Sequence, residues 1–145
     1  MNSTRLLLLS LICVMPSCNG AFRQEWKSAL VASQAPGSTE GAWEGRWLSE
    51  SNGHTGRLRA VVGPLVGSTR PVHYHATWGR ILSGSFRAKH LTHGKEGITT
   101  FIVDEPLGRY GQFKAEGMIT GDVFKAKYSA VGDRGTFDLR RPLPR

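Results

Sequence analysis

From position 42 onward, apolar and polar residues alternate along the chain with a period of two. Phe124, Ala126 and Tyr128, for example, are separated by Lys125 and Lys127. Successive side chains of a strand point to opposite faces, so this pattern predicts strands with one buried and one solvated face, as in antiparallel sheets. We predict eight such strands, over residues 42–49, 57–63, 72–79, 84–91, 97–104, 110–117, 121–129 and 135–140.

The segments between these strands are short and rich in Gly, Asn and Asp. Short strands at regular spacing, separated by such turns, predict a β-meander. An open sheet of eight strands would expose two unpaired edges, and closure of the sheet removes both. The expected fold is therefore an all-β domain over residues 42–145, an eight-stranded antiparallel up-and-down barrel.

The first predicted turn lies in the segment 49–56, which joins the first two strands. Asn52-Gly53 predicts a type I′ turn, because both residues tolerate positive φ. His54 follows the turn, and we expect it to face solvent. A catalytic role for this histidine would need a nucleophile or carboxylate held beside it, and the sequence identifies neither.

The N-terminal residues have the pattern of an export signal. The segment 6–14 is an apolar run behind a single basic residue. It is too short to span a bilayer, which needs about 20 residues, and it fits the hydrophobic region of a signal peptide. Met15-Pro16-Ser17-Cys18 resembles the lipobox of bacterial lipoproteins, which implies cleavage after residue 17 and lipidation of Cys18. Asn19 is not the aspartate of inner-membrane retention, so the resemblance favours the outer membrane.

Residues 18–41 are expected to form the lipidated N-terminus, a short helix and a linker. Phe22, Trp26, Ala29 and Leu30 recur at helical spacing, which predicts an amphipathic helix lying on the barrel or near the membrane surface. Residues 35–41 have the Pro, Gly and Ser content of a linker.

Charge and cysteine content limit the functional classes. The formal net charge is +8, and the two cysteines, Cys13 and Cys18, both precede the barrel. The domain is therefore not a disulfide-stapled miniprotein. Basic residues at outward positions favour anionic partners and exclude the apolar exterior of a membrane-spanning barrel. The residues expected to bind an anionic surface are Arg57, Arg59, Arg87, Lys89, Lys125 and Lys127.

Two resemblances to known proteins follow from short motifs. Gly45-Arg46-Trp47 resembles the G-x-W motif of lipocalin-like and avidin-like barrels. In lipocalins the tryptophan closes one barrel end and a C-terminal arginine packs over it. The resemblance implies these roles for Trp47 and for Arg140, with Arg141 as an alternative.

The broader resemblance is to a group of small, exported, uncharacterised bacterial proteins. It rests on three motifs that span most of the barrel: W-x-G-x-W, N-G-H-x-G-x-L-R and D-R-G-x-F-x-L-x-R. This resemblance implies a shared barrel and no particular activity.

The histidines raise a metal-site hypothesis. His73 and His75 share a strand face, and a hairpin through residues 80–83 would bring His90 opposite one of them. Three converging imidazoles could bind zinc or copper. No P-loop, G-x-S-x-G or dinucleotide-binding motif is present, so we expect no cofactor and no enzymatic activity.

These features together favour a non-enzymatic cell-envelope lipoprotein in the outer membrane or periplasm. Its basic barrel would bind anionic lipid, glycan or a protein partner. Two alternatives remain: a small-ligand carrier that uses the barrel interior, and a metal-dependent enzyme built on the three histidines. Nucleic-acid binding is disfavoured by the export signal.

Overall fold

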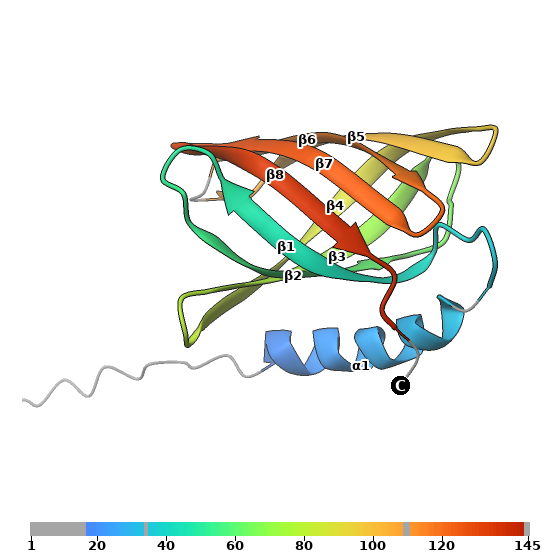
Figure 1. Ribbon diagram of the computed structural model, residues 1–145, viewed down its shortest axis with the longest axis horizontal. Coiled ribbons are helices and arrows are strands. Elements are labelled where there is room, and N and C mark those ends of the chain that lie inside the picture. The colour runs from blue at the N-terminus through green and yellow to red at the C-terminus, as the bar shows by residue number, and fades with distance from the viewer. Residues whose placement is uncertain (1–16, 34, 109–110, 144–145) are drawn as a thin grey trace, which may run out of the picture.

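The protein, described by a computed structural model, folds into a closed β-barrel with one helix against its side (Figure 1). The structure describes residues 17–33, 35–108 and 111–143, with backbone only for residues 17–19. Residues 1–16 of the predicted signal peptide, which comprises residues 1–17, lie outside the described residues. The elements, in chain order, are α1 (Ser17–Ala32), β1 (Gly41–Ser49), β2 (Thr55–Val62), β3 (Thr69–Trp78), β4 (Leu82–Lys95), β5 (Ile98–Pro106), β6 (Gln112–Thr120), β7 (Val123–Ala130) and β8 (Asp133–Arg140).

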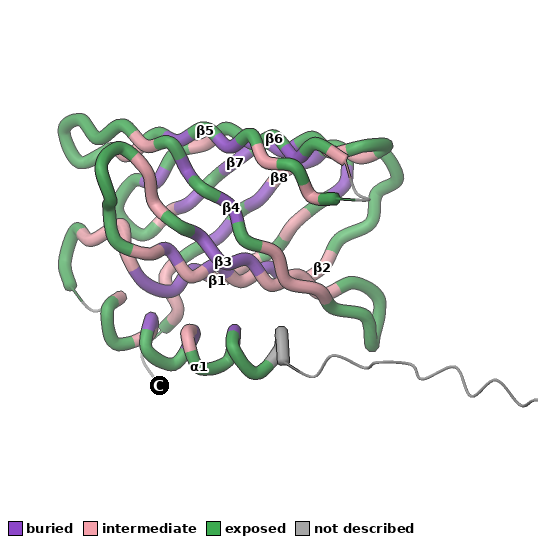
Figure 2. Tube along the Cα trace, turned by 180° about the vertical axis from the view of Figure 1, so that it is seen from behind, coloured by how far each residue is buried: buried purple, intermediate pink, exposed green. Residues whose placement is uncertain are grey.

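The eight-stranded up-and-down barrel predicted from the alternation is confirmed. Each strand pairs antiparallel with the next, and β1 pairs with β8 to close the sheet, with Gly45 opposite Leu139. β8 shows the alternation clearly, since Phe137 and Leu139 are buried while Asp138 and Arg140 are exposed. Figure 2 shows the same alternation of buried and exposed residues along the strands.

The barrel interior is filled by aromatic rings. His90 stacks on Phe101 at 4.2 Å between ring centroids, and Tyr128 stacks on Phe137 at 4.9 Å. Offset-stacked and edge-to-face ring pairs contribute beyond the area that they bury. The other buried or partly buried rings of this core are Trp43, Trp47, Tyr74, Phe86, Phe113 and Phe124.

The turn between β1 and β2 differs from the predicted type I′ turn. Gly53 has φ 75°, but Asn52 does not have positive φ, which a type I′ turn requires at both central residues. The Gly53 amide instead donates to the carbonyl of Ser49 at 2.9 Å, and the Asn52 side chain accepts from the His54 amide at 2.9 Å. This longer loop leaves His54 exposed, as the sequence predicts. Consecutive positive φ angles occur at Glu96 and Gly97, between β4 and β5.

The predicted amphipathic helix is confirmed, and it lies on the outside of the barrel rather than apart from it. Phe22, Trp26 and Ala29 are buried, and Leu30 is partly buried. They pack on Ala42 and Val61, small or apolar residues at outward positions of β1 and β2. In Figure 1 the helix runs along the lower side of the barrel, opposite β5, β6 and β7. The helix thus gives one side of the barrel a second layer.

An arginine packs over a tryptophan at one barrel end, but the tryptophan is Trp43 rather than the predicted Trp47. The arginine is Arg141, the predicted alternative to Arg140. Arg140 is exposed because it alternates with the buried Leu139 in β8. Arg141 lies beyond the last strand, and its guanidinium folds back to 3.9 Å from the ring centroid of the fully buried Trp43.

Arg141 also ties together segments that are far apart in sequence. Its Nη1 donates to the Ala42 carbonyl at 3.1 Å and to the Ser33 hydroxyl at 3.3 Å, and its Nη2 donates to the Ser38 carbonyl. The Ser33 hydroxyl accepts a hydrogen bond from the Ala42 amide and donates to the Ala29 carbonyl. One guanidinium therefore connects the end of α1, the linker and the start of β1.

Trp47 lies near the other end of β1 and has a different role. Its indole Nε1 donates to the Thr77 carbonyl in β3 at 3.0 Å, across the intervening strand β2. A Cβ atom at Gly56 in β2 would lie 1.7 Å from that carbonyl oxygen and 2.7 Å from the indole nitrogen. Glycine at this position therefore allows Trp47 to reach β3.

Asp133 forms hydrogen bonds that link strands at the same end of the barrel as Trp47. Its carboxylate accepts hydrogen bonds from the Ser49 hydroxyl at 2.5 Å and from the Tyr128 hydroxyl at 3.0 Å. Burial, with the neighbouring Asp133 charge, raises the pKa of Tyr128, so the phenol stays protonated and donates. These two bonds join β1 and β7 to the start of β8.

Replacement of Arg141 by alanine should lower the free energy of unfolding by about 1–3 kcal/mol, because a cation–π contact and several hydrogen bonds are lost. The matched control is Arg140→Ala, one residue earlier and exposed, for which we expect a change within about 0.5 kcal/mol. Urea unfolding of both variants provides the measurement. Equal effects of the two substitutions would contradict the role assigned to Arg141.

Candidate functional site

The three histidines of the metal hypothesis lie on opposite sides of the sheet. His73 and His75 point outward toward α1, where Phe22 packs against both rings at centroid distances of 5.0 Å. His90 points inward and is 1% exposed. Its backbone partner across the β3–β4 pair is Arg70, not His73 or His75. The predicted convergence is therefore wrong, and the described residues contain no group of three His, Cys, Asp or Glu side chains placed to hold a metal ion.

His90 and Tyr74 form a hydrogen-bonded pair inside the barrel. The Tyr74 hydroxyl lies 2.9 Å from His90 Nε2, and both side chains are fully buried. Burial raises the pKa of Tyr74 and lowers the pKa of His90 to about 3, so both groups are neutral at neutral pH. A buried polar group is tolerated when it is hydrogen-bonded. Surrounded by aromatic rings, this pair is a component of the core.

The buried histidine should make the stability depend on pH. Below the ordinary histidine pKa of 6.5, His90 binds a proton in the unfolded chain. In the folded protein His90 stays unprotonated down to about pH 3, because its pKa is lowered to about 3. Stability should therefore be full above pH 6.5 and fall as the pH drops toward 3, by up to about 1.4 kcal/mol per pH unit from this residue.

His90→Gln keeps a hydrogen-bonding partner for Tyr74 but does not titrate, so its free energy of unfolding should fall less steeply between pH 6.5 and 4 than that of the wild type. His54→Gln, at an exposed turn position, is the control and should keep the wild-type slope. Urea unfolding across this pH range measures both. Identical slopes for His90→Gln and the wild type would contradict the assignment.

On the outer surface, the helix is held by a charged cluster. Glu25 of α1 accepts from His73 Nδ1 at 2.9 Å and pairs with Arg87 of β4. Burial alone would raise the pKa of Glu25, but the hydrogen bonds and charges of Arg87 and His73 outweigh it and the pKa is lowered. Arg59 lies 4.8 Å from the Trp26 ring centroid and 3.4 Å from Glu44. This cluster fixes α1 against β2, β3 and β4.

The predicted anion-binding residues are on the barrel exterior, as expected, but several have carboxylate partners. Arg59 and Arg87 belong to the cluster beneath α1. Lys125 lies 3.9 Å from Asp138. Lys127 stands opposite Glu116 in the β6–β7 register. Arg57 and Lys89 are exposed, and these six residues do not form one continuous site, since they lie on β2, β4 and β7.

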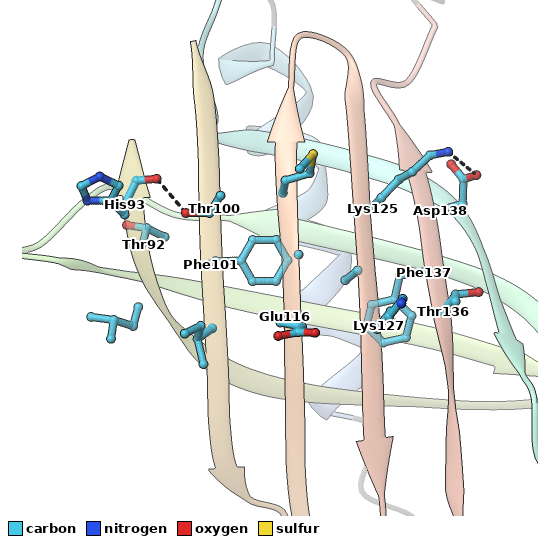
Figure 3. A pocket seen from close by; sticks show the side chains of 15 residues that line it. Thr92, His93, Thr100, Phe101, Glu116, Lys125, Lys127, Thr136, Phe137 and Asp138 are labelled. Carbon is cyan, nitrogen blue, oxygen red and sulfur yellow. Dashed lines mark hydrogen bonds and ion pairs between the residues drawn. The ribbon is translucent and has the colours of Figure 1, made fainter. Parts of the chain in front are cut away.

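A groove of about 820 Å³ lies on the outer face of β4 to β8 (Figure 3). Two cross-strand rows of outward side chains line it. The first row is Leu91, Ile102, Glu116, Lys127 and Thr136. The second row is His93, Thr100, Met118, Lys125 and Asp138.

The groove combines exposed apolar side chains with compensated charges. Leu91, Ile102 and Met118 are 52%, 59% and 49% exposed. The charged residues toward β7 and β8 are two lysines and two carboxylates: Lys125 lies 3.9 Å from Asp138, and Lys127 stands opposite Glu116 in the strand register. An exposed apolar patch with a polar rim is typical of an interaction surface. The groove is not predicted by the pattern of outward basic residues, which indicates a basic exterior throughout. The signal was in β5, where Ile102 interrupts the alternation between the buried Phe101 and Val103.

Cys18, the predicted lipidation site, lies in the first turn of α1. Only three residues separate it from Phe22, the first described buried residue of the helix. Within the described part of the chain, no helix has the length and apolar character needed to cross a membrane.

Comparisons with family models, with curated proteins and with solved structures found no match to this chain. The resemblances to lipocalin-like barrels and to small exported bacterial proteins therefore stay predictions.

Proposed function

We propose that this protein is a non-enzymatic cell-envelope lipoprotein, anchored through Cys18 at the outer membrane or in the periplasm, whose barrel exterior binds a protein partner. The proposal rests on the division of the surface into two sides. α1 and its basic neighbours occupy one side, and the apolar groove of β4 to β8 occupies the other (Figures 1 and 3).

The groove is the observation that most supports the proposed binding of a protein partner. Aromatic side chains occupy the barrel interior, which a small-ligand carrier would need to keep open. The binding surface is therefore assigned to the exterior. A polyanion would favour unpaired positive charge, whereas Lys125 and Lys127 face Asp138 and Glu116. Apolar side chains beside paired charges better fit a segment of another protein.

The lipid anchor is supported by the lipobox resemblance and by the position of Cys18 in the first turn of a helix that is packed on the barrel. A lipid group at this position would hold the domain close to the membrane. A basic surface adds a second attraction to anionic lipid, as stable anchoring by lipid chains commonly requires.

The anchor predicts that cells fed labelled palmitate incorporate the label into the wild-type protein and not into Cys18→Ser. Cys13→Ser, which alters the other cysteine, is the matched control and should be labelled like the wild type. Immunoprecipitation followed by detection of the label provides the measurement. An unlabelled wild type, or a labelled Cys18→Ser protein, would reject the anchor.

The groove predicts a discrete cross-linked partner when a photo-reactive amino acid replaces Ile102 in growing cells. The same amino acid at Val131, which is 75% exposed in the turn between β7 and β8, should give no such product. With the cross-linker at Met118, the substitution Ile102→Glu should reduce the product several-fold, because a charge is introduced into the apolar patch. Products that are the same from Val131 and Ile102 would argue against the groove.

A further inference from the structure

The hairpin between β3 and β4 carries exposed apolar side chains and lies close to the start of α1 (Figures 1 and 2). Trp78, Ile81 and Leu82 are 40%, 92% and 54% exposed, and Arg80 between them is also exposed. Trp78 and Leu82 form the last pair of the β3–β4 ladder, and Gly79, with φ 61°, begins the turn. The hairpin extends beyond the barrel wall in both views (Figures 1 and 2).

The N-terminal end of α1 lies on the same side of the molecule as this hairpin. Phe22 packs against His73 and His75 of β3, and β3 continues from His75 to Trp78. Cys18 precedes Phe22 by four helical residues, or roughly 6 Å along the axis. Figures 1 and 2, seen from opposite sides, both place the start of the helix beside the hairpin.

Positive charge surrounds this corner. Arg46 and Arg57 stand directly opposite each other in the β1–β2 register, and both are exposed. Asp138 of β8 stands opposite Arg46 in the β1–β8 register, and it also lies 3.9 Å from Lys125. Arg23 of α1 and Arg80 of the hairpin are exposed too. The nearby Glu25 and Glu44 are already paired with Arg87 and Arg59.

We propose that the tip of the β3–β4 hairpin inserts Trp78, Ile81 and Leu82 into the interfacial region of an anionic phospholipid bilayer, next to the lipid attached at Cys18. Tryptophan side chains are enriched at the membrane interface, and aliphatic side chains gain free energy when they transfer from water into the bilayer. Each nearby arginine is attracted to the anionic headgroups. The inference extends the proposed anchor by adding a second point of contact. Two contacts fix the orientation of the barrel, whereas one lipid attachment would leave it free to swivel.

The test uses the full-length gene product, purified from cell membranes and exchanged into vesicles that contain phosphatidylglycerol and shallow spin-labelled lipid. The lipid spin label quenches tryptophan fluorescence on contact. The contribution of Trp78 is obtained by comparison with Trp78→Phe, since the other tryptophans are retained in both proteins. We expect the wild-type signal to be quenched and Trp78→Phe to lose most of that quenching.

The matched variants are Ile81→Ser with Leu82→Ser at the tip, and Leu65→Ser with Val66→Ser in the loop between β2 and β3, where Leu65 and Val66 are 52% and 66% exposed. The tip variant should lose at least half of the Trp78 quenching, and the loop variant should keep it. Vesicles of phosphatidylcholine alone should give weaker quenching. Unquenched Trp78 in phosphatidylglycerol vesicles, or equal effects of the two variants, would overturn the inference.

Palmitate labelling separates this result from the fate of the anchor. A labelled protein with unquenched Trp78 would keep the anchor and reject the hairpin contact. An unlabelled protein with quenched Trp78 would reject the anchor and support the contact of the hairpin with lipid.

Discussion

The pairing of β1 with β8 is the constraint on which the rest of the structure depends. Once the sheet closes, every inward side chain must fit within one small barrel, and bulky aromatic residues fill that space. His90 and Tyr74 are accommodated there only as a neutral hydrogen-bonded pair. These packed side chains occupy the interior, and the helix and the groove both lie on the outer surface.

The exterior is divided by the helix. α1 covers outward residues of β1 and β2, while its Glu25 reaches over β3 to β4. Arg141 fixes the other end of the same layer by joining Ser33, Ser38 and Ala42 above the Trp43 ring. The helix and the barrel thus form one unit within the described residues, and the groove on the far side keeps a defined position relative to the start of α1.

The fold could be predicted from the sequence because strands, turns and the helix are each indicated by residues close together in the chain. Alternation and turn residues identify strands, and Phe22, Trp26 and Ala29 identify the buried face of the helix. The arrangement of the candidate site residues was less predictable, because it depends on which residues far apart in the sequence come into contact. Even so, His90 shares the parity of Phe86 and Ala88 in β4, so its inward position could have been inferred. The choice of Arg141 over Arg140 could not, because it depends on how the chain turns after β8.

The short separation of Cys18 from Phe22, four residues along α1, has a geometric consequence for any partner. A long flexible linker would let a tethered domain adopt many distances and orientations relative to the membrane. With lipid at Cys18 and the β3–β4 hairpin both in contact with a membrane, the groove on the far side of the barrel would face away from that membrane. A partner anchored in the same membrane would then have to extend around the barrel to reach the groove. A partner located on the side of the barrel away from that membrane could reach the groove directly.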